Sequence, residues 1–392
     1  MNRFGFLFVL LFVAASIGVA LAYHRWQGSL AGQANFSSEL PAFERAQPAD
    51  FEFEKTEECG AERTYLEAEI EKFPPVFRDV RARAAADFPR ACLTYMMKRQ
   101  SLTKEGASFA RCPASEGAAG GGSPKPCVSE NYVNVVYNLF GDVTSCFEIP
   151  QKEFLPKLFA ESGFHLNAMS AGFDAGIGHL SPVEIQHANA SFESFKTRIA
   201  SSDLDACKRL KPYLSKVQAF PAGENSCGLM MPPQNPLRNL VYLAIKYDQH
   251  ARAVQKALAR YDVVESLRQA GFRGFEPEQL QQVLITLGFD TGPIAAVLYM
   301  KNFAQARAHA IQKGEAGPLQ DSDFDFNDPS AGRGLASPEA GSMTFPQYLA
   351  MFQVSGTPHF LTRVKAHAKV LNTTFKEGTC VSDSYLSLSS SL

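Results

Sequence analysis

One glutamate in this chain is placed where a carboxyl group can do acid–base chemistry. Apolar residues recur at i, i+4 spacing between Phe154 and Phe159, which predicts a buried helix that ends near Glu161. Burial disfavours the charged form of a carboxyl group, so its pKa rises and it can stay protonated near neutral pH. Glu161 is therefore a candidate general acid, whereas a lone glutamate at an ordinary helix end would be a solvated carboxylate.

The residues that follow Glu161 predict the floor of a cleft. Small residues are frequent in 162–170, and a glycine-containing turn occupies 176–180. Gly176 and Gly178 let a backbone approach a bulky ligand closely, and amides there could hold acetamido or hydroxyl groups. Residues 181–184, Ser-Pro-Val-Glu, form a capping box with proline at the first helical position, so the turn leads directly into a helix.

These residues resemble the motifs of the soluble-type lytic transglycosylases, which share the goose-type lysozyme-like fold. The first family motif, Glu-Ser followed by spaced Phe, Asn or Pro, Ala and Ser, is matched by Glu161, Ser162, Phe164, Asn167, Ala168 and Ser170. The second, Gly-Ile-Gly-Gln-Leu ahead of a proline, is similar to 176–182, with His179 in place of Gln. The third, Tyr-Asn-Ala-Gly-Pro, is similar to 289–293. The resemblance covers about 133–311.

The resemblance implies cleavage of the β-1,4 bond between N-acetylmuramic acid and N-acetylglucosamine in peptidoglycan. Glu161 would act first as acid and then as base, giving a 1,6-anhydro product. No second carboxylate is needed, because the acetamido group of the substrate can assist. The residues that would position the sugar are Ser162, Gly178, His179, Phe289, Asp290 and Gly292. No cofactor or metal is implied, and the expected partner is the glycan strand of peptidoglycan.

Departures from the third motif keep two alternatives open. Phe289 lacks the hydroxyl of the family's tyrosine, and Asp290 replaces its asparagine. A hydrolytic muramidase would need a carboxylate that holds a water across the sugar, which Asp174 or Asp290 could supply. Outside the enzymes, Phe289 favours a catalytically idle protein that binds or scaffolds the cell wall. His179 can still hydrogen-bond to a sugar.

The N-terminal residues 1–22 predict a signal peptide and therefore export. Arg3 is followed by the apolar stretch 4–19, and Ala-Leu-Ala at 20–22 has the small-x-small pattern of a cleavage site. A retained membrane anchor is the alternative, since the segment from Phe4 to Ala22 is just within the roughly 17 to 25 residues that a spanning helix needs. We expect the periplasm or cell envelope of a bacterium, or secretion.

Cysteines after this segment predict disulfides, because an even number behind a signal peptide is typical of an oxidising compartment. They are Cys59, Cys92, Cys112, Cys127, Cys146, Cys207, Cys227 and Cys380. We expect two local pairs, Cys112 with Cys127 and Cys207 with Cys227. No CxxC and no zinc-finger spacing is present, so nothing indicates a metal site.

Composition and periodicity predict a mainly α protein that is not a nucleic-acid binder. The 38 Lys plus Arg and 40 Asp plus Glu leave a formal charge of -2, which excludes purely electrostatic binding to nucleic acid. Strand signals are scarce. We expect a lysozyme-like helical domain with a Cys-containing insertion, preceded by a small Cys-rich helical module. The predicted order is signal peptide 1–22, linker 23–58, Cys-rich module 59–132, lysozyme-like domain 133–315 with insertion 187–234, linker 316–343, C-terminal helical segment 344–380 and tail 381–392.

The pattern also predicts individual helices. Apolar positions indicate helices over 61–73 and 80–97 and a helix that begins at Asn235. Another runs through Leu280 and Leu287 and ends at Gly288, and the next begins at Pro293 and reaches about residue 311. A closing helix begins at 344–347.

Overall fold

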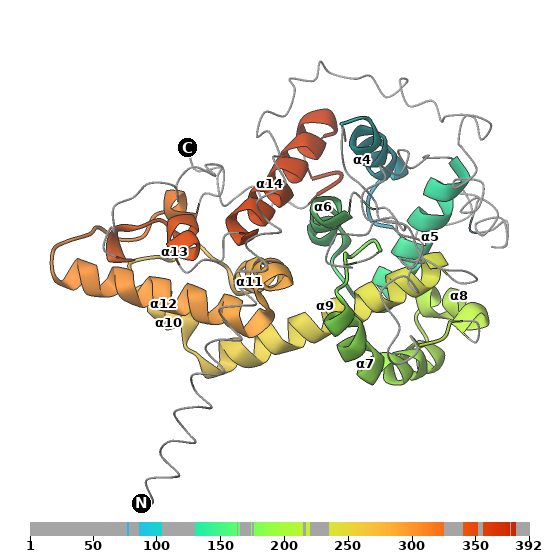
Figure 1. The fold of residues 1–392 in the computed structure, drawn as a ribbon, viewed down its shortest axis with the longest axis horizontal. Coiled ribbons are helices and arrows are strands. Elements are labelled where there is room, and N and C mark those ends of the chain that lie inside the picture. The colour runs from blue at the N-terminus through green and yellow to red at the C-terminus, as the bar shows by residue number, and fades with distance from the viewer. Residues whose placement is uncertain are drawn as a thin grey trace, which may run out of the picture. The chain divides into compact units, whose positions relative to one another are not determined.

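The secondary structure of the described residues is helical, which confirms the predicted mainly α fold (Figure 1). The computed structural model describes residues 77, 86–103, 130–162, 164, 174, 176–214, 217–219, 235–324, 340–351, 356–376 and 378–381, and no β-strand occurs among them. The elements are α4 (Arg90–Thr103), α5 (Glu130–Cys146), α6 (Gln151–Ser162), α7 (Pro182–Ser201), α8 (Asp205–Leu214), α9 (Asn235–Arg260), α10 (Val263–Gln269), α11 (Pro277–Thr291), α12 (Pro293–Gln312), the 3₁₀ helices η6 (Asp321–Phe324) and η8 (Ala340–Ser342), α13 (Phe345–Met351) and α14 (Gly356–Thr374).

Helix α9 is buried in the core and packs against four other helices. It begins at Asn235 as predicted, and residues 239–247 are all buried, so the helix is covered on every side there. It contacts α5, α7, α11 and α12 (Figure 1). Complete burial of such a stretch stabilises the fold through the apolar area removed from water. Helices α7 and α11, which follow the second motif and carry the third, are thereby held against α9.

Two groups of aromatic side chains fill the core. The group next to the end of α6 consists of Phe140, Phe154, Phe159, Phe164, Tyr247 and Phe289. The other consists of Phe272, Phe275, Phe303, Phe324, Phe345 and Tyr348. Tilted and edge-to-face arrangements predominate, which are favourable geometries for aromatic rings. The first group supports the candidate site from within the core.

The predicted end of a helix at Gly288 is wrong, because α11 continues to Thr291. A Cβ atom at Gly288 would lie only 2.9 Å from the Cα atom of Pro293, so this glycine makes room for the start of α12. Gly292, with φ 85°, ends α11, and its N–H donates to the carbonyl of Gly288. The next helix, α12, begins at Pro293 as predicted.

Among the described residues no single helix is long and apolar enough to cross a membrane. The pair α11 and α12, bent by 117° where they meet, has the length and composition of a membrane span only when the two helices are taken together.

The predicted disulfide between Cys207 and Cys227 is also wrong, because Cys207 is bonded to Cys146 at the end of α5. These cysteines are 61 residues apart in sequence, and their Cα atoms lie 4.9 Å apart because α8 packs against α5. An ion pair joins the same two helices, with Arg209 Nη2 2.7 Å from Asp142 Oδ1. The helical part of the predicted insertion is thus fastened to α5. The predicted pair Cys112–Cys127 and the helix over 61–73 lie outside the described residues.

The C-terminal helix α14 is fastened to the first part of the chain. Cys380 is bonded to Cys92 of α4, 288 residues earlier, and the Lys152 ammonium donates to the carbonyl of Gly378 at 2.8 Å. Helix α14 itself packs against α6 and α11, the helices that end at Ser162 and at Thr291 (Figure 1). Within the expected helix over 80–97, residues 86–89 are not helical, and α4 begins at Arg90.

Removal of the Cys92–Cys380 disulfide is expected to destabilise the protein. Replacing both cysteines by serine frees a very long loop in the unfolded chain, so the free energy of unfolding should fall by about 2 to 5 kcal/mol. Urea unfolding of the oxidised proteins measures this difference. Thiol titration of the denatured wild type should detect no free thiol from Cys92, Cys146, Cys207 or Cys380. A variant as stable as the wild type would contradict the prediction.

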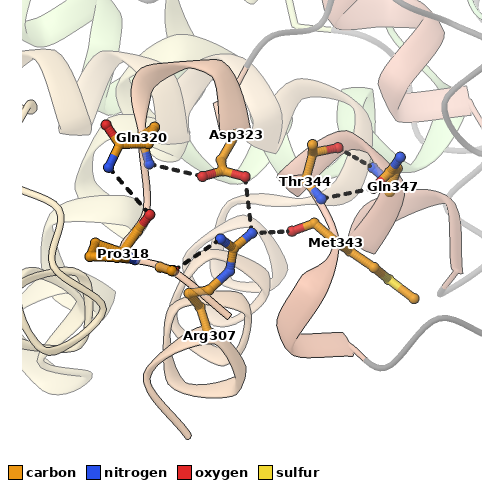
Figure 2. Close-up of polar contacts among 8 residues, drawn as sticks. Arg307, Pro318, Gln320, Asp323, Met343, Thr344 and Gln347 are labelled. Carbon is orange, nitrogen blue, oxygen red and sulfur yellow. Dashed lines mark hydrogen bonds and ion pairs between the residues drawn. The ribbon is translucent and has the colours of Figure 1, made fainter. Parts of the chain in front are cut away.

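A buried arginine connects α12 to the segment that follows it. Arg307 Nη2 lies 2.9 Å from Asp323 Oδ1 of η6 and donates to the carbonyl of Met343 at 2.7 Å, and Nη1 donates to the carbonyl of Gly317 at 3.3 Å (Figure 2). Figure 2 also shows the capping box of α13, in which Thr344 N–H donates to Gln347 Oε1. The closing helix therefore begins where the sequence predicts, and Arg307 holds its start beside η6.

Replacing Arg307 by Met is expected to lower the free energy of unfolding by about 3 to 5 kcal/mol, because it leaves Asp323 without its cation. Arg268→Met is the matched control. The Arg268 side chain is 59% exposed and pairs only with Glu265 on the same helix, so its loss should have a much smaller effect on the free energy of unfolding than the loss of Arg307. Chemical unfolding of both variants tests this, and equal shifts of the two midpoints would contradict the role of Arg307.

Candidate active site

Glu161 lies at the end of a buried helix, as the sequence predicts. Helix α6 ends at Ser162, and its buried residues include Phe154, Leu155, Leu158 and Phe159. The residue retains partial exposure while the helix that carries it is enclosed in the core. The residue as a whole therefore reaches the edge of the core, whereas its carboxyl group is buried.

Ser162 joins the first predicted motif to the second. Its hydroxyl group donates to the carbonyl of Ile177 at 2.6 Å and accepts from the N–H of Phe164 at 3.1 Å. The side chain is buried, with 2% of the residue exposed. Ser162 therefore fixes the glycine turn beside the end of α6, next to Glu161. Because its hydroxyl group both donates and accepts a hydrogen bond within the protein, Ser162 positions the backbone of Phe164 and Ile177.

The glycine turn is seated directly on α9. Ile177 N–H donates to Asn239 Oδ1 at 3.1 Å. A Cβ atom at Gly176 would lie 2.0 Å from the same oxygen, and one at Gly178 would lie 2.5 Å from Leu243 Cδ1. Gly176 also has φ 77°, a conformation that side chains disfavour. The absence of a side chain at both positions thus lets the turn lie against α9.

Strained backbone occurs in both motifs. Phe164 has φ 66° and His179 has φ 48°, and the other non-glycine residue with positive φ in the described part of the chain is Glu148. Such conformations cost about 1 to 3 kcal/mol each and are typical of functional sites. His179 is partly exposed, and its N–H donates to the carbonyl of Gly176 at 3.1 Å. The strain is maintained by the contacts of the turn with Ser162 and Asn239.

The buried ammonium group of Lys246 is one of the charges that act on Glu161. Lys246 Nζ is 2.7 Å from Glu184 Oε1 and 4.6 Å from the centre of the Phe289 ring. Only 5% of the Lys246 side chain is exposed. Burial opposes ionisation of Glu184, but Lys246 and hydrogen bonds from Ser181 outweigh it and lower the pKa of Glu184. The Glu184 carboxylate, which belongs to the capping box of α7, is therefore also the counterion of Lys246.

The pKa of Glu161 is raised from its usual 4.5 to about 8, mainly because burial disfavours the carboxylate. The charges of Lys246 and Arg363 oppose this shift, and those of Asp290 and Glu184 add to it. Glu161 is therefore mostly protonated at pH 7 and can donate a proton. Its neighbouring cations are placed to stabilise the carboxylate that remains after donation.

The third predicted motif contributes one buried residue and two outer ones. Phe289 is 7% exposed, and its ring contacts the Lys246 ammonium and the rings of Phe154 and His250. Asp290 is exposed, and Gly292 has open space where a Cβ atom would lie. Phe289 thus supports Lys246 from the core side, and Asp290 and Gly292 lie at the corner between α11 and α12.

No family model matches the chain, no curated protein is similar to it, and no solved structure matches its fold.

Two further ionisable side chains lie beneath the candidate site. Lys157 is fully buried, with Nζ 5.8 to 5.9 Å from the ring centres of Phe154, Tyr247 and Phe289, and burial lowers the pKa of Lys157 to about 7. Burial and the neighbouring lysines lower the pKa of His250 to about 3, so this imidazole is neutral at pH 7. Among the described residues no group of three or more His, Cys, Asp or Glu side chains could hold a metal ion.

Sequence reasoning missed Asn239, Lys246 and Arg363. Lys246 ends the run Leu240-Val241-Tyr242-Leu243-Ala244-Ile245, and six consecutive apolar residues in a helix indicate burial on all sides. That run could have identified Lys246 as a buried cation. Asn239 and Arg363 reach the site through contacts between distant segments, for which the sequence offers no local signal.

Proposed function

We propose that this protein is a peptidoglycan lytic transglycosylase that cleaves the β-1,4 bond between N-acetylmuramic acid and N-acetylglucosamine. The observation that carries the proposal is the position of Glu161, a carboxyl group whose pKa is about 8, at the end of a buried helix. The order of the three sequence motifs and the hydrogen bond between Ser162 and Ile177 support it. The two disulfides fit export to an oxidising compartment such as the periplasm.

In the proposed reaction Glu161 performs both proton transfers. The protonated carboxyl donates to the glycosidic oxygen while the bond between that oxygen and C1 of the muramyl unit breaks, and the acetamido group assists at C1. The resulting carboxylate, stabilised by Lys246 and Arg363, accepts the proton of the muramyl 6-hydroxyl as O6 bonds to C1. The products are a 1,6-anhydromuramyl end and a glycan with a free 4-hydroxyl, and the enzyme is restored.

Two alternatives each have one supporting observation. Asp290 is exposed and close enough to raise the pKa of Glu161, so it could hold a water for a hydrolytic muramidase. Phe289 carries no hydroxyl and packs under Lys246, which favours an idle protein that binds peptidoglycan. Lys246 weakens the case for an idle protein, because its ammonium group supplies beside Glu161 a polar group that Phe289 lacks.

Product analysis on purified peptidoglycan tests the proposal. The wild-type protein should release fragments with 1,6-anhydro ends, detected by mass spectrometry, and should create no new reducing ends. New reducing ends would instead identify a hydrolase. Binding without any cleavage would identify the idle protein.

A further inference from the structure

Helix α14 brings an arginine to the candidate active site. It packs against α6 and α11 (Figure 1). The His367 ring lies 6.2 Å from the ring of Phe159, two residues before Glu161. Arg363 lies four residues before His367, on the same face of α14. Its charge also acts on the ionisation of Glu161, so the guanidinium group is within electrostatic reach of that carboxyl.

The Arg363 side chain is exposed and lies against an aromatic ring. Its guanidinium carbon lies 5.8 Å from the ring centre of Phe360, which is buried at 2% exposure. Within the described part of the chain, Arg363 forms no hydrogen bond and no ion pair. Lys246, in contrast, is buried and forms an ion pair with Glu184. An exposed, oriented guanidinium offers a planar set of donors that matches a carboxylate.

The chain that follows α14 is attached to the helix that carries Glu161. The Cys92–Cys380 disulfide and the hydrogen bond from Lys152 to Gly378 hold the end of the helical segment. Since Lys152 belongs to α6, the helix that carries Glu161 is connected directly to the segment that carries Arg363. These attachments support the packing of α14 on α6, so the backbone of α14 is held beside the helix that carries Glu161.

We propose that Arg363 binds a carboxylate carried by the muramyl unit of the substrate, so that the site selects acidic muramyl glycans over neutral glucosamine glycans. This inference rests on the proposed function. The carboxylate has two possible sources: the lactyl group of a muramyl unit without peptide, or the peptide stem of an intact one. Both present the same chemistry to the guanidinium.

Binding to three soluble probes tests the inference. The probes are a neutral N-acetylglucosamine oligomer, a muramyl glycan without peptides, and the same glycan with its peptide stems. Binding is measured by calorimetry with the Glu161→Gln variant, which cannot cleave the probes. The Arg363→Gln substitution is then made in that variant and the measurements are repeated. Affinity for an acidic probe should fall about 10 to 100-fold, whereas affinity for the neutral probe should not change. Lys369→Gln is the matched control, because it removes the same charge from an exposed position of α14.

The pattern across the probes decides between the outcomes. A loss of affinity for the peptide-free glycan identifies the lactyl carboxylate, and a loss confined to the third probe identifies the peptide stem. Equal effects of Arg363→Gln and Lys369→Gln, or an equal loss on the neutral probe, would overturn the inference. If the wild-type protein still releases anhydro ends in that case, only the role of Arg363 fails. If it neither cleaves peptidoglycan nor binds any probe, the proposed function fails and the inference fails with it.

Discussion

Replacing Glu161 by Gln is expected to reduce the rate of peptidoglycan cleavage by at least about 100 to 10,000-fold, the contribution assigned to general acid and base catalysis. The amide keeps the size of the side chain but has no proton to transfer at neutral pH. Glycan binding should persist, because the groups that position the sugar are unchanged. Release of anhydro ends and sedimentation with insoluble peptidoglycan measure the two properties separately.

Asp290→Asn is the comparison that identifies the working carboxyl group. If Glu161→Gln leaves lysis unchanged and Asp290→Asn abolishes it, Asp290 carries the chemistry and the motif assignment is wrong. If neither the wild type nor Glu161→Gln cleaves, yet both bind glycan equally, the protein is an idle binder.

Stability measurements separate loss of chemistry from damage to the fold. In the folded protein Glu161 has a pKa of about 8, above its usual 4.5, so the unfolded chain loses this proton at lower pH than the folded one. Wild-type stability should therefore fall between about pH 5 and pH 8, by at most about 1.4 kcal/mol per pH unit from this group. The amide does not ionise, so the stability of Glu161→Gln relative to the wild type should rise across the same interval.

Local sequence patterns predicted the elements that carry the site. The apolar spacing before Glu161 predicted the buried helix α6, and the Ser-Pro-Val-Glu stretch predicted the capping box of α7, in which Ser181 and Glu184 bond reciprocally. Proline marked the start of α12. Each of these signals depends on residues within one or two turns of each other, so the sequence contains them completely.

Contacts between distant segments could not be predicted in this way. Cys207 pairs with Cys146 instead of Cys227 because α8 packs on α5. Helix α11 continues past Gly288, where a glycine is present because a side chain would collide with Pro293. The cations near Glu161 come from α9 and from α14, and α14 lies outside the stretch that resembles a known family. Residue type predicted the acid, whereas tertiary packing determines which charges surround it.

The pH dependence of cleavage should reveal those surrounding charges. Because the free enzyme must carry protonated Glu161, kcat/KM should be nearly constant below the pKa of about 8 and fall tenfold per pH unit above it. At pH 10 the rate constant should be about 100-fold below its plateau. Initial rates of anhydro-end release, measured at low substrate concentration between pH 5 and pH 10, give this profile. A profile that stays flat to pH 10 would exclude Glu161 as the essential acid.

Two exposed residues should move the alkaline limb of the profile in opposite directions. Asp290 raises the pKa of Glu161, so Asp290→Asn should shift the limb to lower pH, and Arg363 lowers that pKa, so Arg363→Gln should shift the limb to higher pH. Lys369→Gln removes a charge from α14 that does not act on Glu161, and it should leave the limb in place. Shifts in the same direction for Asp290→Asn and Arg363→Gln cannot arise from charges acting on one carboxyl group, and they would place the titrating acid elsewhere in the protein.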